Sequence, residues 1–218
     1  MPHLRHFFMK FYWIKTNALI RALFRKYVWK MPHDGKTVYL TFDDGPVAEC
    51  TPWVLDQLAQ YNYKATFFCI GNNIEQHPGL LQRIIREGHS VGNHTQHHVN
   101  GWKTPTDVYL SEVKKCNDAL SVFGIKSALF RPPYGKLTRV QRNKLLGMGF
   151  QIIMWDILSA DFDSRVTPPA CTNNVLRHLK PGSIVIFHDS VKAWPNLKVA
   201  LPATLKAIKE KGYQSAAL

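Results

Sequence analysis

The chain has 218 residues, 45% of them hydrophobic, with 28 Lys or Arg against 15 Asp or Glu, so its formal net charge is +13. This composition excludes an intrinsically disordered chain, and the length is ordinary for one large α/β domain. The charge favours an anionic partner such as a glycan or a membrane surface, but no nucleic-acid-binding motif has the expected spacing, so we expect no nucleic-acid partner.

Residues 1–35 are predicted to form a basic, aromatic N-terminal extension. Residues 1–31 contain seven Lys or Arg and no acidic residue, and their apolar runs are too short to span a bilayer or to form a cleavable signal peptide. We therefore expect a chain that is cytoplasmic or peripherally attached to a membrane. Residues 1–30 would form either an amphipathic helix on the membrane surface or a helix packed against the domain with its basic face in water.

Four cysteines are widely spaced and form no Cys-x-x-Cys pair: Cys50, Cys69, Cys116 and Cys171. Neither a disulfide framework nor a zinc knuckle is indicated, so we expect reduced and mostly buried thiols.

From residue 36 onward, β-branched and aromatic runs alternate with amphipathic helical stripes. Strands are predicted at 38–42, 64–70, 89–92, 127–130, 150–155 and 183–187, and helices at 51–61, 80–88, 105–120, 138–146, 168–179 and 197–211. This alternation predicts a parallel sheet, and about seven such units favour one (β/α) barrel domain over residues 36–218.

The first predicted strand ends in two acids, Asp43 and Asp44, and Gly45-Pro46 stops it. Adjacent side chains on an extended backbone point to opposite sides, so one acid could hold a metal while the other moves a proton. The alternative is a solvated Asp-Asp-Gly turn that closes a hairpin.

Polar side chains also follow the later strands: His94, His98, Arg131, Tyr134, Asp161 and His188. Each has a structural alternative, such as a buried histidine, a surface arginine or a helix cap. In barrels, however, the C-terminal ends of the strands form the mouth of the active site, so the repeated placement favours one shared pocket.

The segment His94-Thr-Gln-His-His98 offers imidazoles at positions i and i+4. On a helical turn they would lie about 6 Å apart and could reach one metal ion, with His97 as the alternative ligand. Two histidines and a carboxylate make a three-ligand catalytic site. These donors suit one divalent ion, which we expect to be Zn, with Co, Ni or Fe as alternatives.

Four motifs in this order resemble those of the polysaccharide deacetylase family, the NodB-homology or carbohydrate esterase family 4 domain: Thr41-Phe-Asp-Asp-Gly45, His94-Thr-x-x-His98, Arg131-Pro-Pro-Tyr134 and Ile186-Phe-His188. The resemblance runs from about residue 36 to residue 212. It implies a distorted, TIM-barrel-related (β/α) barrel. It also implies a metal-dependent hydrolase that removes N-acetyl groups from GlcNAc-type polysaccharides or oligosaccharides, such as peptidoglycan or chitin, and releases acetate.

The same resemblance implies the roles of the metal ligands and the base. Asp44, His94 and His98 would hold the metal. Asp43 would be the general base, and Arg131 would position it.

The remaining roles concern the oxyanion and the acid. The backbone N–H of Tyr134 would stabilise the oxyanion, and His188, paired with Asp161, would be the general acid. The sequence departs from the family where Leu158 replaces an Asp and Phe162 replaces a Trp.

The sequence leaves two alternative functions open. The metal site could serve an O-acetyl esterase or an N-deacylase of a small or lipid-linked amino sugar, which the basic extension and the lack of a carbohydrate-binding module favour. A non-catalytic glycan-binding module would require a lost catalytic group, whereas every expected group is present. The family implies no role for Asp156 or Asp163.

Overall fold

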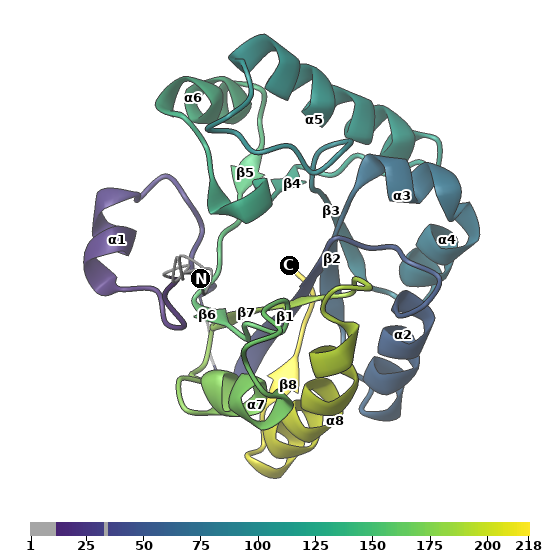
Figure 1. Cartoon of the computed structure of the whole chain (residues 1–218), viewed down its shortest axis with the longest axis vertical. Helices are drawn as coiled ribbons and strands as arrows, with labels where there is room; N and C mark the ends of the chain where they lie inside the picture. Colours follow the sequence, from purple (N-terminus) through teal and green to yellow (C-terminus); the bar gives the residue numbers. More distant parts are fainter. Residues whose placement is uncertain (1–11, 33–34) are drawn as a thin grey trace, which may run out of the picture.

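The computed structural model describes residues 12–32 and 35–218, and its centre is a curled parallel sheet (Figure 1). The strands follow the order β5-β4-β3-β2-β1-β7-β6, and β8 pairs with β1 outside this path. Their bounds are β1 Thr37–Asp43, β2 Ala65–Cys69, β3 Ser90–Asn93, β4 Leu129–Phe130, β5 Gln151–Ile152, β6 Ile157–Leu158, β7 Ile184–His188 and β8 Gln214–Ser215.

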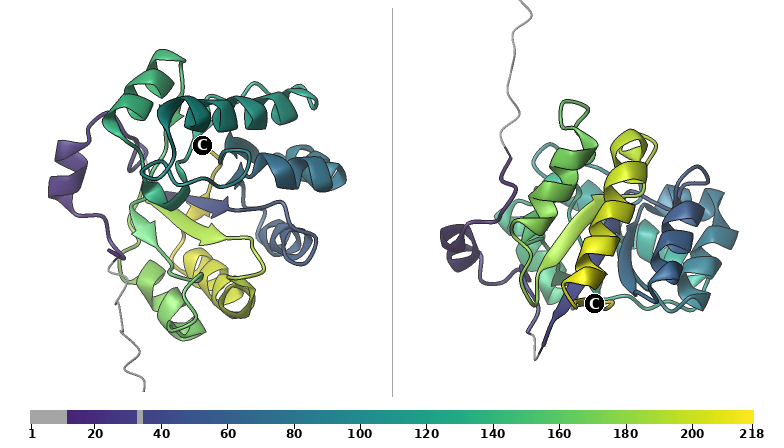
Figure 2. Two further views of the ribbon diagram at one scale, coloured as in Figure 1. Left: turned by 45° about the horizontal axis from the view of Figure 1, so that its top comes forward. Right: turned by 90° about the horizontal axis from the view of Figure 1, so that it is seen from below.

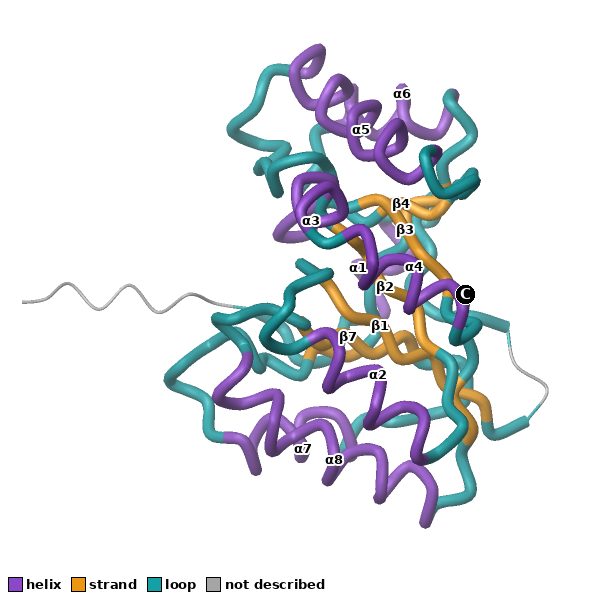
Figure 3. The backbone as a smooth tube through the Cα atoms, turned by 90° about the vertical axis from the view of Figure 1, so that its right-hand side faces the viewer, coloured by secondary structure: helices purple, strands orange, loops and turns teal. Residues whose placement is uncertain are grey.

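The helices cover the outside of this sheet (Figures 1 and 3). Their bounds are α1 Ala18–Leu23, α2 Thr51–Gln60, α3 Gly71–Gln76, α4 Pro78–Arg86, α5 Thr106–Ser121, α6 Arg139–Gly147, α7 Pro168–Leu176 and α8 Trp194–Glu210, with a 3₁₀ turn at Pro133–Gly135. Helices α7 and α8 lie side by side (Figure 2). The prediction of a single, distorted (β/α) barrel domain is confirmed.

The central strands are apolar because helices and the barrel interior bury both of their faces. All five residues of β2 are buried. β1 pairs with β2 and β7, so that Leu40 lies opposite both Ala65 and Val185. This register places the C-terminal ends of β1 and β7 side by side, with Asp43 opposite His188.

The predicted strand over residues 150–155 is wrong, because it is reduced to β5 and is followed by a separate β6. The backbone between them makes hydrogen bonds to other partners. Met154 N donates to Val28 O at 2.8 Å, and Asp156 N donates to Ile184 O at 2.9 Å. Two further elements, α3 and β8, are also absent from the prediction.

Residues 12–32, here called the N-terminal strap, run between the two edges of the sheet, with α1 on the outside (Figure 1). β-Bridges join Lys15 to Ile157 next to one edge and Val28 to Ile153 next to the other. The strap is thus packed against the barrel. Residues 1–11 of the predicted extension, which include the bases Arg5 and Lys10, lie outside the described part of the chain.

The four cysteines are free and buried, as expected. Burial raises the pKa of the Cys69 thiol, which therefore stays protonated. None of the helices within residues 12–32 and 35–218 is both long enough and apolar enough to cross a membrane. The location of the chain in the cell stays a prediction.

Candidate active site and metal centre

Three of the predicted ligands, Asp44, His94 and His98, form a cluster at the C-terminal ends of β1 and β3. Their ligand atoms all lie within 4.8 Å of one another. Asp44 Oδ1 is 3.2 Å from His98 Nε2 and 3.7 Å from His94 Nε2. Within the described residues, no other group of this kind has the spacing of a metal site.

The expectation that His94 and His98 share a helical turn is wrong, because residues 94–100 form an irregular loop. Thr95 and His98 have φ angles of 66° and 55°, in the left-handed region. These two turns fold the loop back on itself, and the two imidazole centroids lie 5.0 Å apart. Loop geometry, not helical periodicity, produces the spacing that the sequence pattern suggested.

Most non-glycine residues with positive φ in the described chain lie at or next to this site. Non-glycine residues with positive φ cost about 1–3 kcal/mol each and persist where surrounding contacts hold them. Of the six in the described chain, five are site residues or their neighbours: Asp44, Thr95, His98, Tyr134 and Ala160. At Asp44 the φ of 80° is held by Asn73, whose Nδ2 donates to the Asp44 carbonyl at 2.7 Å.

The donor set fits a divalent metal ion. Asp44 Oδ1 is buried and accepts no hydrogen bond from the described residues, so it is available to a metal ion. Burial lowers the pKa of His94 to about 4, so its imidazole is neutral at neutral pH, as a metal ligand must be. The Nδ1 atoms of His94 and His98 lie 2.7 Å from Arg131 O and 3.2 Å from the Tyr134 hydroxyl, which leaves both Nε2 atoms directed at Asp44.

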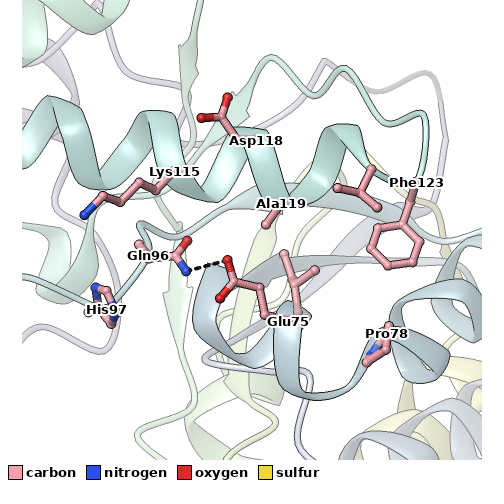
Figure 4. Close-up of a pocket in the computed structure, with 10 residues that line it drawn as sticks. Glu75, Pro78, Gln96, His97, Lys115, Asp118, Ala119 and Phe123 are labelled. Atoms are coloured by element: carbon pink, nitrogen blue, oxygen red, sulfur yellow. Dashed lines mark hydrogen bonds between the residues drawn. The ribbon is translucent and has the colours of Figure 1, made fainter.

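His97, the alternative ligand, faces away from this cluster. Its Nδ1 lies 3.0 Å from Glu112 Oε2. The side chain lines a groove of about 700 Å³ beside α3 and α5, where Gln96 Nε2 donates to Glu75 Oε1 at 3.0 Å (Figure 4). No member of the Asp44, His94 and His98 cluster lines this groove.

We expect His98→Ala to weaken metal binding by at least about 10²-fold, because one of three protein ligands is lost. His97→Ala is the matched control and should leave metal affinity unchanged. Calorimetric titration of the metal-stripped variants with Zn or Co measures the metal affinity of each. The reverse outcome would show that His97, not His98, is the ligand.

The predicted general base and its partner form a buried ion pair. Arg131 is fully buried, and its Nη1 donates to Asp43 Oδ1 at 2.6 Å and to Thr41 Oγ1 at 2.7 Å. The guanidinium also donates to Ile153 O and Met154 O. With four acceptors, two on β1 and two on the segment after β5, Arg131 holds Asp43 Oδ1 in a single position and leaves Oδ2 free of the guanidinium.

His188 and Asp161 form the second pair. Asp161 Oδ2 accepts the backbone N–H of His188, and Oδ1 lies 2.8 Å from His188 Nδ1. Burial by itself lowers the pKa of His188, but the charge and hydrogen bond of Asp161, aided by Asp44 and Asp43, raise it to about 9. The imidazole is therefore protonated at neutral pH.

The eight predicted residues are thus linked into one site by direct contacts and by the register of β1 and β7. The family model for polysaccharide deacetylases matches residues 30–153, more than half of the chain. The chain belongs to the polysaccharide deacetylase family. Deacetylases of this family are metal-dependent hydrolases.

Relatives and solved structures agree with this membership. A peptidoglycan-N-acetylglucosamine deacetylase of Bacillus cereus is 36% identical over 204 residues, which cover 93% of this chain and 71% of the relative. A chitooligosaccharide deacetylase of Rhizobium leguminosarum is 33% identical over 171 residues, or 76% and 79% of the two chains. The solved Bc1960 peptidoglycan N-acetylglucosamine deacetylase has a TM-score of 0.83 at 35% identity, covering 88% and 91%.

The polysaccharide deacetylase fold does not by itself establish activity. A CE4 family pseudoenzyme from Bacillus anthracis matches with a TM-score of 0.77 at 25% identity, covering 87% of this chain and 66% of that one. Activity of the present polysaccharide deacetylase therefore depends on its own site residues.

We expect Asp161→Asn to move the alkaline limb of activity to lower pH. A pKa raised to about 9 keeps His188 protonated below that value, and its acid form is lost as the pH rises through it. Without the carboxylate charge, burial dominates and the pKa of His188 falls. The pH dependence of kcat should show this shift, and ¹⁵N NMR of the imidazole gives an independent value. An unchanged limb would mean that another group sets it.

Three further residues concern the family comparison and the surroundings of His188 and His98. Phe162, where the family has Trp, packs edge-on against His188 with centroids 5.1 Å apart, so the apolar wall is retained. Tyr134, named for its backbone N–H, also uses its side chain, whose ring packs against His98 at 4.6 Å. Leu158, where the family has Asp, is a buried core residue.

Asp189, which no sequence motif indicated, supports the loop that carries the two acids. Its Oδ1 accepts Gly45 N–H at 3.1 Å, its Oδ2 accepts the Thr51 hydroxyl at 2.6 Å, and its backbone N–H donates to Asp43 O. A Cβ atom at Gly45 would lie 2.0 Å from Asp189 Oδ2, so a glycine is required there. The position of Asp189 directly after His188 was the available signal.

The two acids without an implied role are structural. Asp163 accepts hydrogen bonds from the Arg165 guanidinium and, at 2.9 Å, from the Tyr12 hydroxyl. Asp156 is fully buried and pairs with Lys15 and Arg21 of the strap. Both acids attach the strap to the barrel.

Proposed function

We propose that this chain removes N-acetyl groups from GlcNAc-type polysaccharides or oligosaccharides, of the peptidoglycan or chitin kind, and releases acetate. The observation that carries the proposal is the pair of proton-transfer groups on adjacent strand ends. Asp43 and His188 are register partners on β1 and β7, beside the Asp44, His94 and His98 cluster. A carboxylate and a protonated imidazole at one metal site are the groups that amide hydrolysis needs.

The first half of the reaction uses Asp43. A metal ion held by Asp44, His94 and His98 would supply Lewis acidity, which lowers the pKa of water and polarises a carbonyl. Asp43 Oδ2, left open by Arg131, accepts a proton from the attacking water as its oxygen bonds to the acetyl carbon. The Tyr134 backbone N–H would donate to the oxyanion that develops on the acetyl oxygen.

The second half uses His188. The C–N bond breaks only if the amine leaves with a proton, because an amide anion is too basic to leave. His188 gives that proton to the nitrogen, and the products are acetate and the free amino sugar. Asp161 keeps the imidazole oriented and protonated beforehand.

Zinc is the metal we propose, because two neutral imidazoles and one carboxylate make a three-ligand set typical of catalytic zinc. Cobalt, nickel and iron are the alternatives that the same donors accept.

A membrane surface is a further proposed partner for residues 1–30. Support comes from the strap, where Leu19 and Leu23 are 65% and 67% exposed and are followed in the sequence by the exposed cations Arg25 and Lys26. Exposed apolar side chains beside cations suit an anionic bilayer. Cosedimentation with phosphatidylglycerol vesicles, but not with phosphatidylcholine vesicles, is expected, and a Leu19→Ser/Leu23→Ser variant should lose it. Equal binding of both proteins to both vesicles would contradict this contact.

The test of the main proposal is acetate release from N-acetylated chito-oligosaccharides and peptidoglycan fragments. The protein is stripped of metal, assayed, reloaded with Zn or Co and assayed again. Acetate that appears only after reloading supports the proposal. No acetate from a fully loaded protein would contradict it, and O-acetylated glycans and small N-acyl amino sugars in the same assay would then test the alternatives.

A further inference from the structure

Asp156 is a buried acid that the proposed chemistry does not use. It is 0% exposed and has three side-chain partners. Lys15 Nζ lies 2.5 Å from Oδ2, Arg21 Nη1 lies 3.0 Å from Oδ1, and Ser183 Oγ donates to Oδ2 at 2.8 Å. Two of the three come from the N-terminal strap, so Asp156 is the point where the strap is clamped to the barrel.

Backbone hydrogen bonds continue this clamp along the segment between β5 and β6. On one side, Val28 N donates to Ile152 O and Met154 N donates to Val28 O. On the other side, the strap pairs with residues 155–158: Thr16 N donates to Asp156 O, Thr16 Oγ1 donates to Trp155 O, and Leu158 N donates to Ile14 O. β5 and β6 are the two edge strands of the sheet, and the strap supplies hydrogen-bond partners for the segment that connects them (Figure 1).

The segment between β5 and β6 contacts the Arg131–Asp43 pair and continues to Asp161, the partner of His188. Ile153 O and Met154 O accept two of the guanidinium hydrogen bonds of Arg131, which fixes Asp43. A few residues further on, Asp161 orients His188. The metal ligands come from a different part of the barrel, the loops after β1 and β3.

We infer that the N-terminal strap, through the Lys15–Asp156–Arg21 clamp, is a positioning element for the base and the acid of the catalytic site, and not for its metal. This inference rests on the proposed deacetylase function. The family model covers residues 30–153, so the clamp lies outside the matched region on both sides. A displacement of about 1 Å in a catalytic base or acid can lower the rate by about 10²-fold, so a small shift of the clamped segment would be enough to affect catalysis.

The test compares full-length variants of the clamp. Asp156→Asn removes the charge at constant size, Lys15→Met removes one cation, and Lys15→Arg keeps the cation as the conservative variant. Asp56→Asn is the matched control, because Asp56 on α2 pairs with Arg83 on α4, on the other side of the molecule from the strap (Figure 1). For each, kcat, KM, metal stoichiometry and amide hydrogen exchange are measured.

We expect Asp156→Asn to lower kcat per metal-loaded site by about 10- to 10²-fold, with KM and metal stoichiometry unchanged. Lys15→Met should have a smaller effect, and Lys15→Arg and Asp56→Asn should have none. Exchange should rise in peptides covering residues 153–161 and not in those covering Asp43 and Asp44. The double variant Lys15→Met/Asp156→Asn should have the same kcat as Asp156→Asn alone, because both substitutions break the same Lys15–Asp156 contact.

Four outcomes separate the inference from its alternatives. A folded Asp156→Asn protein with normal kcat and normal exchange at residues 153–161 overturns it, and so does an equal loss of metal binding and activity, which indicates general destabilisation. If Asp156→Asn does not fold, Lys15→Met decides by the same readouts, since Arg21 and Ser183 still contact Asp156. If the wild-type protein releases no acetate, the proposed function fails, whereas the exchange data still test the clamp.

Discussion

Replacing Asp43 by asparagine is expected to lower kcat for acetate release by about 10²- to 10⁴-fold. Asparagine has the same shape but cannot accept the proton of the attacking water. Asp44, His94 and His98 are untouched, so metal stoichiometry should stay at the wild-type value. Steady-state kinetics on metal-saturated protein, with metal content measured in parallel, checks both parts of this expectation.

The same substitution should also destabilise the fold. Burial lowers the pKa of Arg131, and the charge of Asp43 opposes this effect. Removing one partner of a buried ion pair costs about 3–5 kcal/mol. Asp118→Asn is the control, because it removes a carboxylate from an exposed pair with Lys114. An Asp43→Asn protein that binds metal and keeps more than about a tenth of wild-type kcat would exclude Asp43 as the base.

Replacing His188 by alanine is the second large effect, a loss of about 10²- to 10⁴-fold in kcat on an N-acetyl substrate. In the proposed mechanism, His188 is the group that gives the amine its proton. The loss should depend on the leaving group, because a phenolate leaves without a proton. The ratio of wild-type to His188→Ala rates should therefore be much smaller for 4-nitrophenyl acetate than for a chito-oligosaccharide.

Two further measurements test whether His188 acts as the acid and not as a metal ligand. Metal affinity of His188→Ala should equal that of the wild type, because His188 is not in the ligand cluster. The alkaline limb associated with the His188 pKa of about 9 should disappear from the variant. Equal losses on the amide and the ester would show that His188 does not act as the acid.

The sequence alone predicted the barrel and the residues that meet at the C-terminal ends of its strands. The alternation of apolar strands and amphipathic helices carries the fold, since parallel strands buried on both faces leave a strong apolar signal. The site residues were found because parallel strands all end on one face. Asp43, His94, Arg131 and His188 lie at the C-terminal ends of four different strands, and this placement can be predicted without any distance.

The tertiary structure alone decided how those residues are held. The His94–His98 spacing depends on left-handed turns at Thr95 and His98 that no helical periodicity encodes. Asp189 supports the acidic loop across 144 residues of sequence, from Asp189 to Gly45. Asp156 meets Lys15 at a separation of 141 residues. Such contacts depend on which side chains the folded chain brings together, and a local sequence pattern carries no signal for partners so far apart.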